Sequence, residues 1–161
     1  MTDGTQFRPM RRFKQQLRDE TCIEILKHAP RGVLAVLGDF GYPYTIPLNF
    51  VYENGKIFFH CAKEGHKIDA IRNCDKASFC VLNEGEKEPG SWWYHFESVV
   101  CFGRIRIIDD HTLADAKLRL LGAKYFPDDY DIEHDMSQNA PHAEVLELSI
   151  EHLTGKSVKE K

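Results

Sequence analysis

Hydrophobic residues either alternate with polar ones at the two-residue period of β-strands or form short continuous runs. The segments that carry this pattern are residues 32–38, 44–52, 57–61, 76–82, 92–109 and 143–155. Pro47 lies inside the second segment, and because proline donates no backbone hydrogen bond, we expect that strand at a sheet edge. Asn54-Gly55 predicts a hairpin between the second and third segments. The pattern predicts about six strands.

Wider hydrophobic spacing predicts helices within residues 19–32, 66–74 and 110–126. Thr21 and Glu24 have the spacing of a capping box at the start of the first helix. The second helix should bury Ile68 and Ile71, and the third carries an apolar stripe that ends at Tyr125. Because strands outnumber helices and hairpins dominate, we expect a mainly β fold with helices. A small antiparallel barrel fits this pattern better than a doubly wound parallel sheet.

The two ends of the chain are polar. We expect a flexible N-terminal arm over residues 1–18, a single domain over 19–156 and a C-terminal tail over 157–161. The acidic segment 127–135 suggests calcium at first sight, but it lacks the glycine and glutamate spacing of a calcium loop. A solvated loop is the favoured interpretation.

Composition and charge exclude several functions. The net charge of −4 gives no overall attraction to nucleic acid or to an anionic membrane, and the basic stretch at 8–18 is short. No apolar run approaches the roughly 20 residues that span a bilayer, and the N-terminus does not resemble a secretory signal. The five cysteines are odd in number and form no Cys-x-x-Cys pair, which indicates a reduced, cytoplasmic protein.

The stretch "HCAKEGHK", residues 60–67, joins an expected strand to an expected helix. On a strand His60 and Cys61 point to opposite faces, so they cannot bind one metal ion together, and we expect no metal site. The start of a helix offers free backbone N–H groups and a positive dipole end, to which Lys67 adds a full charge. Lys63 and His66 could reinforce a phosphate site there. An ordinary polar turn without a ligand is the alternative.

Other polar and aromatic residues are weaker candidates. Asn49 shares a strand face with Pro47, where backbone groups freed at a bulge could bond a planar heterocycle. The alternative is an asparagine bonded to water. An aromatic cluster could be a stacking platform for an aromatic ligand or, more often, core or subunit interface; its members are Trp92, Trp93, Tyr94 and Phe96. The sequence fixes no Ser-His-Asp or Cys-His arrangement.

The segment "GYPYTIPLNFVYENGKIFFHCAKEGHKIDAIRNCDKASFCV", residues 41–81, resembles the core of the nitroimidazole-resistance (Nim) family. This family belongs to the flavin-binding proteins related to pyridoxamine-phosphate oxidase. The later "SVVCFGRIRII" and "IEHLTGK" extend the resemblance over roughly residues 11–156. It implies a six-stranded antiparallel split β-barrel of the FMN-binding type. It also implies a homodimer with FMN in two grooves at the subunit interface.

The resemblance implies a role for each matching residue. Lys67 and the turn from His60 to His66 would take the FMN phosphate, and Ser98 and Val99 would approach the flavin from the partner subunit. The strand around Asn49 would lie along the isoalloxazine ring, largely through backbone groups. His60 matches a histidine thought to be reactive in some Nim proteins. The implied cofactor-binding residues are Pro47, Leu48, Asn49, Phe50, His60, Cys61, Ala62, His66, Lys67, Ser98, Val99 and His152.

Two departures from the wider group bear on the substrate. Pyridoxamine-phosphate oxidases have an Arg-Lys pair where this chain has His66-Lys67. Their C-terminal substrate-clamping Arg/His pattern is also missing. Oxidation of a vitamin B6 phosphate is therefore not expected.

The expected function is that of an FMN-dependent oxidoreductase, with FAD as the alternative flavin. Electrons would pass from NAD(P)H to an electron-poor acceptor such as a nitroaromatic. Because the sequence has no dinucleotide fingerprint, NAD(P)H would bind only transiently. The alternatives are a non-enzymatic flavin carrier or sensor, and a haem-binding split-barrel protein.

Overall fold

The computed structural model describes residues 6–159, which form an antiparallel seven-stranded sheet in the order β2-β1-β5-β6-β7-β4-β3. The strands are β1 (Gly32–Leu37), β2 (Pro43–Leu48), β3 (Val51–Glu53), β4 (Lys56–Ala62), β5 (Lys76–Leu82), β6 (His95–Ile107) and β7 (Ala143–Lys159). The helices are α1 (Asp19–His28), α2 (His66–Asn73), α3 (His111–Tyr125) and α4 (Ile132–Asn139). Short 3-10 turns cover Phe13–Gln15, Asp39–Gly41 and Ala140–His142.

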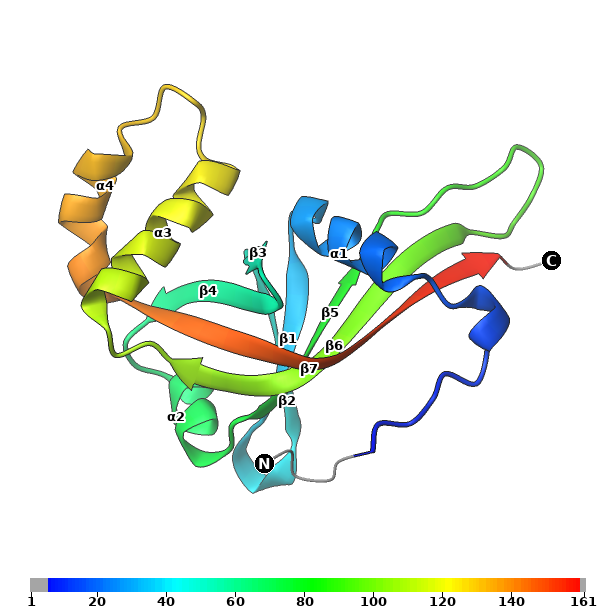
Figure 1. Cartoon of the computed structure of the whole chain (residues 1–161), viewed down its shortest axis with the longest axis horizontal. Coiled ribbons are helices and arrows are strands. Elements are labelled where there is room, and N and C mark those ends of the chain that lie inside the picture. The colour runs from blue at the N-terminus through cyan, green and yellow to red at the C-terminus, as the bar shows by residue number, and fades with distance from the viewer. Residues whose placement is uncertain (1–5, 160–161) are drawn as a thin grey trace.

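The sheet curves around the main core but does not close. Figure 1 shows β6 and β7 as long curved strands that cross the molecule, with α1 and α2 on either side of them. The helices α3 and α4 lie side by side beyond the start of β7. The terminal strands β2 and β3 are consecutive in the chain, yet no ladder joins them within residues 6–159. The sheet therefore remains open between its two edges.

Several sequence predictions are confirmed. Strand β2, which contains Pro47, is an edge of the sheet. The hairpin between β3 and β4 turns at Asn54 and Gly55, both with positive φ. Helix α2 buries Ile68 and Ile71.

In the described part of the chain no helix is long and apolar enough to cross a lipid bilayer.

The strand expected over residues 44–52 is interrupted, so the sheet has seven strands and not six. The first part is β2, the second is β3, and the chain bends between them at Asn49 and Phe50. The alternation of apolar and polar residues does not reveal such a bend, because the apolar side chains before and after it both point toward the core. Leu48 packs against the main core and Phe50 is part of it.

Two helix predictions were wrong in detail. Helix α1 begins at Asp19, after Arg18, so Thr21 lies inside the helix and does not cap it. The solvated loop expected over residues 127–135 runs instead into α4. Asp131 caps this helix, since its carboxylate accepts a hydrogen bond from the His134 N–H at 3.0 Å. The acidic residues do not reveal this helix, because charge alone does not distinguish a solvated turn from a helix start.

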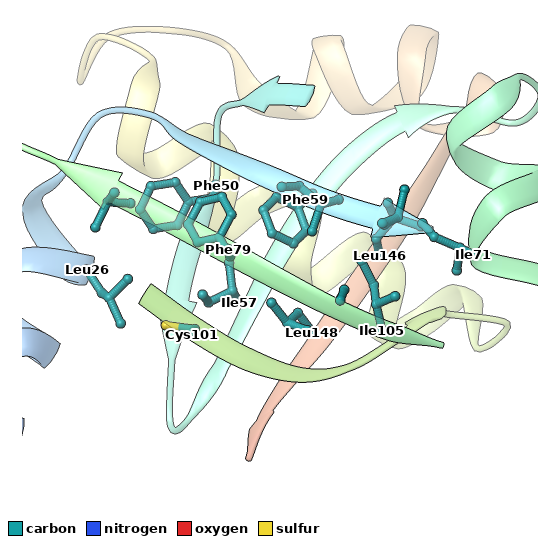
Figure 2. Packing of buried hydrophobic residues seen from close by; sticks show 14 of the residues in the cluster. Leu26, Phe50, Ile57, Phe59, Ile71, Phe79, Cys101, Ile105, Leu146 and Leu148 are labelled. Atoms are coloured by element: carbon teal, nitrogen blue, oxygen red, sulfur yellow. The ribbon is translucent and has the colours of Figure 1, made fainter. Parts of the chain in front are cut away.

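The main core lies in the concave interior of the sheet. Figure 2 shows Phe50, Phe59 and Phe79 together at its centre. The Phe79 ring packs edge-on against Phe50 at 4.8 Å and against Phe59 at 5.1 Å between centroids. A second cluster joins α3 to the sheet and includes Phe58, Leu121 and Val145. Successive residues of β4 therefore face different clusters.

Candidate functional site

The turn between β4 and α2 presents an open helix start. Gly65 precedes α2 with a φ of 124°, and no side chain caps the first backbone N–H groups. A Cβ added at Gly65 would meet no atom within 4 Å, so the space around it is free. Within the described residues, no hydrogen bond or ion pair engages the Lys67 ammonium. A helix start with free N–H groups beside a cation suits an anionic group.

His66 fixes this turn to the β1–β2 connection. Its ring stacks on Tyr44 at 4.1 Å between centroids, and its Nε2 atom accepts a hydrogen bond from the Asp39 N–H at 3.3 Å. The Asp39 carboxylate lies 3.7 Å from the same nitrogen. His66 therefore holds the start of α2 against the sheet edge, in addition to any contact with a ligand.

His60 and Cys61 point to opposite sides of β4, as the sequence predicts. Cys61 packs against the main core, whereas His60 is exposed and lines a cavity under α3 and α4. Burial raises the pKa of the Cys61 thiol, with Lys67 acting in the opposite direction. The thiol therefore remains protonated near neutral pH. Across residues 6–159, no cluster of three or more His, Cys, Asp or Glu could hold a metal ion.

The bend at Asn49 and Phe50 is held by α3. The Tyr125 hydroxyl accepts a hydrogen bond from the Phe50 N–H at 2.9 Å. It lies within donating distance of the Phe50 and Pro30 carbonyl oxygens, at 2.8 Å and 2.7 Å. The Asn49 side-chain oxygen accepts a hydrogen bond from Arg31 at 3.3 Å. Since the Phe50 backbone groups already have partners, Asn49 is the more available residue of the pair.

Lys124 completes the attachment of α3 to the bend. Its ammonium donates to the Ala29 and Phe50 carbonyl oxygens at 2.8 Å and 2.9 Å, and it lies 4.1 Å from the centre of the Phe50 ring. Burial lowers the pKa of Lys124 to about 8. Sequence reasoning missed this pair, because Tyr125 fitted the apolar stripe of a helix and Lys124 an ordinary surface position.

We expect Lys124 to make the protein more stable as the pH rises from about 8 to about 10, because its ordinary pKa is about 10.4. In that range the unfolded chain binds a proton that the folded protein has released, so the free energy of unfolding increases with pH. Urea denaturation of the wild type and of Lys124→Met across this range measures the effect as a difference. The comparison with the variant is needed because burial also raises the pKa of the Cys22 and Cys101 thiols. Those two groups lower the free energy of unfolding as the pH rises, and they do so equally in both proteins. Parallel pH curves for the two proteins would contradict the assignment.

Ser98, Val99 and His152 lie away from the turn within one chain. Ser98 pairs with Lys156 near the end of β7, whereas Ala62 pairs with Ala143 at its start. The Val99 side chain is fully buried in the main core, so its outward contacts are limited to the backbone. The His152 ring stacks under Phe7 of the N-terminal segment at 4.6 Å. Within one chain, Ser98 and Val99 therefore lie beside the C-terminal part of β7, away from the turn that follows β4.

The outward face of β1, β5 and β6 carries exposed apolar side chains. Leu37, Leu82 and Phe102 project from β1, β5 and β6 with 48%, 58% and 41% of their surface exposed. The loop that follows β5 adds Trp92, which is 71% exposed and stacks on Trp93 at 4.0 Å. Trp92 is therefore not part of the core of this chain. Large apolar side chains exposed on one face of a sheet can mark an interaction site.

Two hollows flank the helical pair α3 and α4. The smaller, with a volume of about 320 Å³, lies between these helices and the end of β4 and brings together Asn49 and His60. The larger, of about 1170 Å³, lies on the other side of the pair and is bordered by Arg72, Arg106 and Arg119. The smaller cavity thus contacts Asn49 and His60, whereas the larger contacts Lys63.

Comparison with known proteins supplies a family and a fold. A family model described as pyridoxamine 5'-phosphate oxidase matches residues 18–157 of the chain. No curated protein matches it at a significant level.

Solved structures share the fold at low sequence identity. A candidate 5-nitroimidazole antibiotic resistance protein from Bacteroides thetaiotaomicron superposes with a TM-score of 0.77 and 21% identity, over 88% of this chain and 86% of that one. A FAD-binding protein from Mesorhizobium loti superposes with a TM-score of 0.67 and 24% identity, over 90% of this chain and 98% of that one. The flavocytochrome Anf3 from Azotobacter vinelandii superposes with a TM-score of 0.73 and 20% identity, over 94% of this chain and 73% of that one.

Proposed function

The chain belongs to the pyridoxamine 5'-phosphate oxidase family, and from this premise we propose that it is a flavin-binding oxidoreductase. FMN is the proposed flavin, with FAD as the alternative. NAD(P)H is the proposed reductant, and the acceptor is an electron-poor compound such as a nitroaromatic. Structural neighbours described as FAD-binding, as a flavocytochrome and as a nitroimidazole resistance protein support this direction.

The observation that carries the proposal is the uncapped start of α2 beside Lys67. The residues fit a phosphate group, because free N–H groups, a positive helix end and an unpaired ammonium converge there. His66, held by Tyr44 and Asp39, keeps this helix start in place. Lys63 lies on the same turn and adds a second positive charge.

In this proposal the flavin ring would lie at the open side of the sheet, between β2 and the end of β4. Pro47, Leu48 and Asn49 would line one side, and His60, Cys61 and Ala62 the other. Bound flavin supplies hydride or electron transfer, and the chain supplies position, polarity and access. The backbone of Phe50 is already hydrogen-bonded to α3. In this proposal Phe50 therefore does not bind the flavin directly but holds the bend of the chain beside the flavin ring.

We further propose a homodimer in which a second copy covers the apolar outer face. The exposed side chains of Leu37, Leu82 and Phe102 support this proposal, because such a surface is costly to leave in water. Ser98, Val99 and His152 would then reach the flavin of the partner subunit. This accounts for their separation from the turn within one chain.

A cytoplasmic, reducing environment is proposed from the cysteines. All five are free thiols, and burial raises the pKa of the innermost, Cys22 and Cys101. Such thiols are unreactive and require no oxidising compartment.

Turnover distinguishes the oxidoreductase from a flavin carrier. Flavin-loaded protein is expected to oxidise NADH or NADPH at an increased rate when a nitroaromatic or quinone is added, with the acceptor reduced in proportion. Absorbance at the nicotinamide band measures this, and free flavin at the same concentration is the control. Stable flavin binding with no turnover above that control would favour the carrier.

A further inference from the structure

Arg31 differs from the other arginines of the folded domain because no carboxylate neutralises it. Of the five arginines in residues 19–159, the other four lie between 2.7 and 3.8 Å from a carboxylate oxygen, and these are Arg72, Arg104, Arg106 and Arg119. In the part of the chain that the structure describes, no ion pair engages Arg31, and its side chain bonds to Asn49. Its positive charge is therefore available to a ligand.

The start of β1 fixes the place of this arginine. Gly32 pairs with Leu48 at the end of the ladder between β1 and β2, so Arg31 and Asn49 lie opposite each other just beyond it. The Arg31 Nε–H group donates to the Asn49 side-chain oxygen at 3.3 Å. This bond leaves both terminal nitrogens of the guanidinium free. Their paired N–H groups suit a phosphate or a carboxylate.

The surroundings of Arg31 are positive. The Lys124 ammonium donates to the Ala29 carbonyl oxygen, close to Arg31 in the chain. Burial lowers the pKa of Lys124, and no carboxylate opposes this effect. Burial raises the pKa of Tyr125, and the positive charge of Arg31 acts in the opposite direction. Since no carboxylate acts on either group, an anion beside the bend would be attracted and not repelled.

This place for an anion is separate from the start of α2. His66 holds the start of α2 against Asp39, which follows β1, whereas Arg31 precedes β1. The six residues of β1 separate the two points by roughly 20 Å, because a strand rises about 3.3 Å per residue. Arg31 is exposed and borders neither of the hollows beside α3 and α4. A long ligand can therefore reach it from solvent.

The proposed reactants differ in charge. The single phosphate of FMN is assigned to the start of α2, so it does not need Arg31. A nitroaromatic or quinone acceptor carries no phosphate, whereas NADH and NADPH both carry a diphosphate. The reductant is thus the reactant whose chemistry matches a second cationic site.

We propose that Arg31 is a specificity-determining residue for the reductant and that its guanidinium binds the diphosphate of NADH or NADPH. This inference rests on the proposed function, which takes NAD(P)H as the electron donor. Asn49 orients the guanidinium beside the proposed flavin ring. Arg31 binds and positions the donor and takes no part in hydride transfer. A single exposed guanidinium gives weak binding, in agreement with a sequence that has no dinucleotide fingerprint.

Arg31→Gln is expected to raise the KM for NADH and for NADPH by about tenfold and to leave kcat within about twofold, as the loss of a uniform binding contact does. Steady-state kinetics of flavin-loaded protein with saturating acceptor measures both constants. The wild-type KM should also rise with added NaCl, and that of Arg31→Gln much less, because salt screens an exposed charge. A merely structural role would leave this salt dependence in place.

Two further variants make the result specific. Arg12→Gln removes the same charge from an exposed arginine of the N-terminal segment and should leave the KM unchanged. Arg31→Lys keeps the charge but not the paired N–H groups, so it should recover only part of the affinity. Because FAD also carries a diphosphate, quenching of flavin fluorescence is used to compare FMN and FAD binding. Both dissociation constants should be the same in the wild type and in Arg31→Gln.

Binding of ADP-ribose gives a readout that does not depend on turnover. Isothermal titration calorimetry is expected to show about tenfold weaker binding to Arg31→Gln than to the wild type. Adenosine, which lacks the diphosphate, should show no difference between the two proteins.

Three results would overturn the inference: an unchanged KM in Arg31→Gln, a loss of FAD affinity without a change in KM, or an effect confined to NADPH, which would place Arg31 at the 2′-phosphate. Flavin binding without turnover, with ADP-ribose binding still dependent on Arg31, would overturn the proposed oxidoreductase and retain the diphosphate site.

Discussion

Phe79→Ala is expected to lower the free energy of unfolding by about 3–5 kcal/mol, the usual cost of removing a buried aromatic ring. The ring is fully buried and packs edge-on against Phe50 and Phe59, so its loss leaves a cavity at the centre of the main core. Urea denaturation measures the change. The bend at Asn49 and Phe50 rests on this cluster, so the candidate site should loosen as well.

Phe40→Ala is the matched control, because it removes the same ring from a position that is 97% exposed. Its effect should lie within about 0.5 kcal/mol, as for most surface substitutions. A similar loss for both variants, or a loss below about 1 kcal/mol for Phe79→Ala, would contradict the packing described for the core.

Lys67→Ala is expected to weaken FMN binding by about tenfold to a hundredfold. A hydrogen bond to a charged group contributes about 1.5–3 kcal/mol, and Lys67 lies in the first turn of α2, whose start would hold the phosphate. Quenching of flavin fluorescence on titration measures the dissociation constant. The variant should still fold, because no hydrogen bond or ion pair to Lys67 is found in the described structure.

Two comparisons make this result specific. Lys67→Arg keeps the charge and should retain most of the affinity, whereas binding of riboflavin, which has no phosphate, should change little in Lys67→Ala. Equal weakening of FMN and riboflavin would show that Lys67 acts on the fold or the ring and not on the phosphate.

The strands and hairpins could be predicted from the sequence because their signals are local. The boundaries of β5 agree with residues 76–82, and the Asn54-Gly55 turn joins the strands that it was expected to join. The bend at Asn49 and Phe50 could not be predicted in this way. Its cause is the packing of Phe50 and its hydrogen bonds to Tyr125, which is distant in the sequence.

The candidate site could be predicted only where its residues lie close together in the sequence. The turn from His60 to Lys67 is contiguous, and its strand-to-helix geometry follows from local pattern. The cavity above His60 depends on α4, whose acidic start resembles a solvated loop in sequence, and on the fit of Gly122 against Ile132. In the proposed homodimer Ser98 and His152 join the site through a second copy of the chain, which no pattern within one chain reveals.

The most direct test of the central claim is the visible spectrum of the freshly purified protein, with the released chromophore identified by mass. The account predicts the absorption bands of an oxidised flavin, release of FMN on denaturation, and loss of the bands in Lys67→Ala. A colourless protein that does not take up added FMN or FAD, or one with a haem Soret band and no flavin, would contradict it.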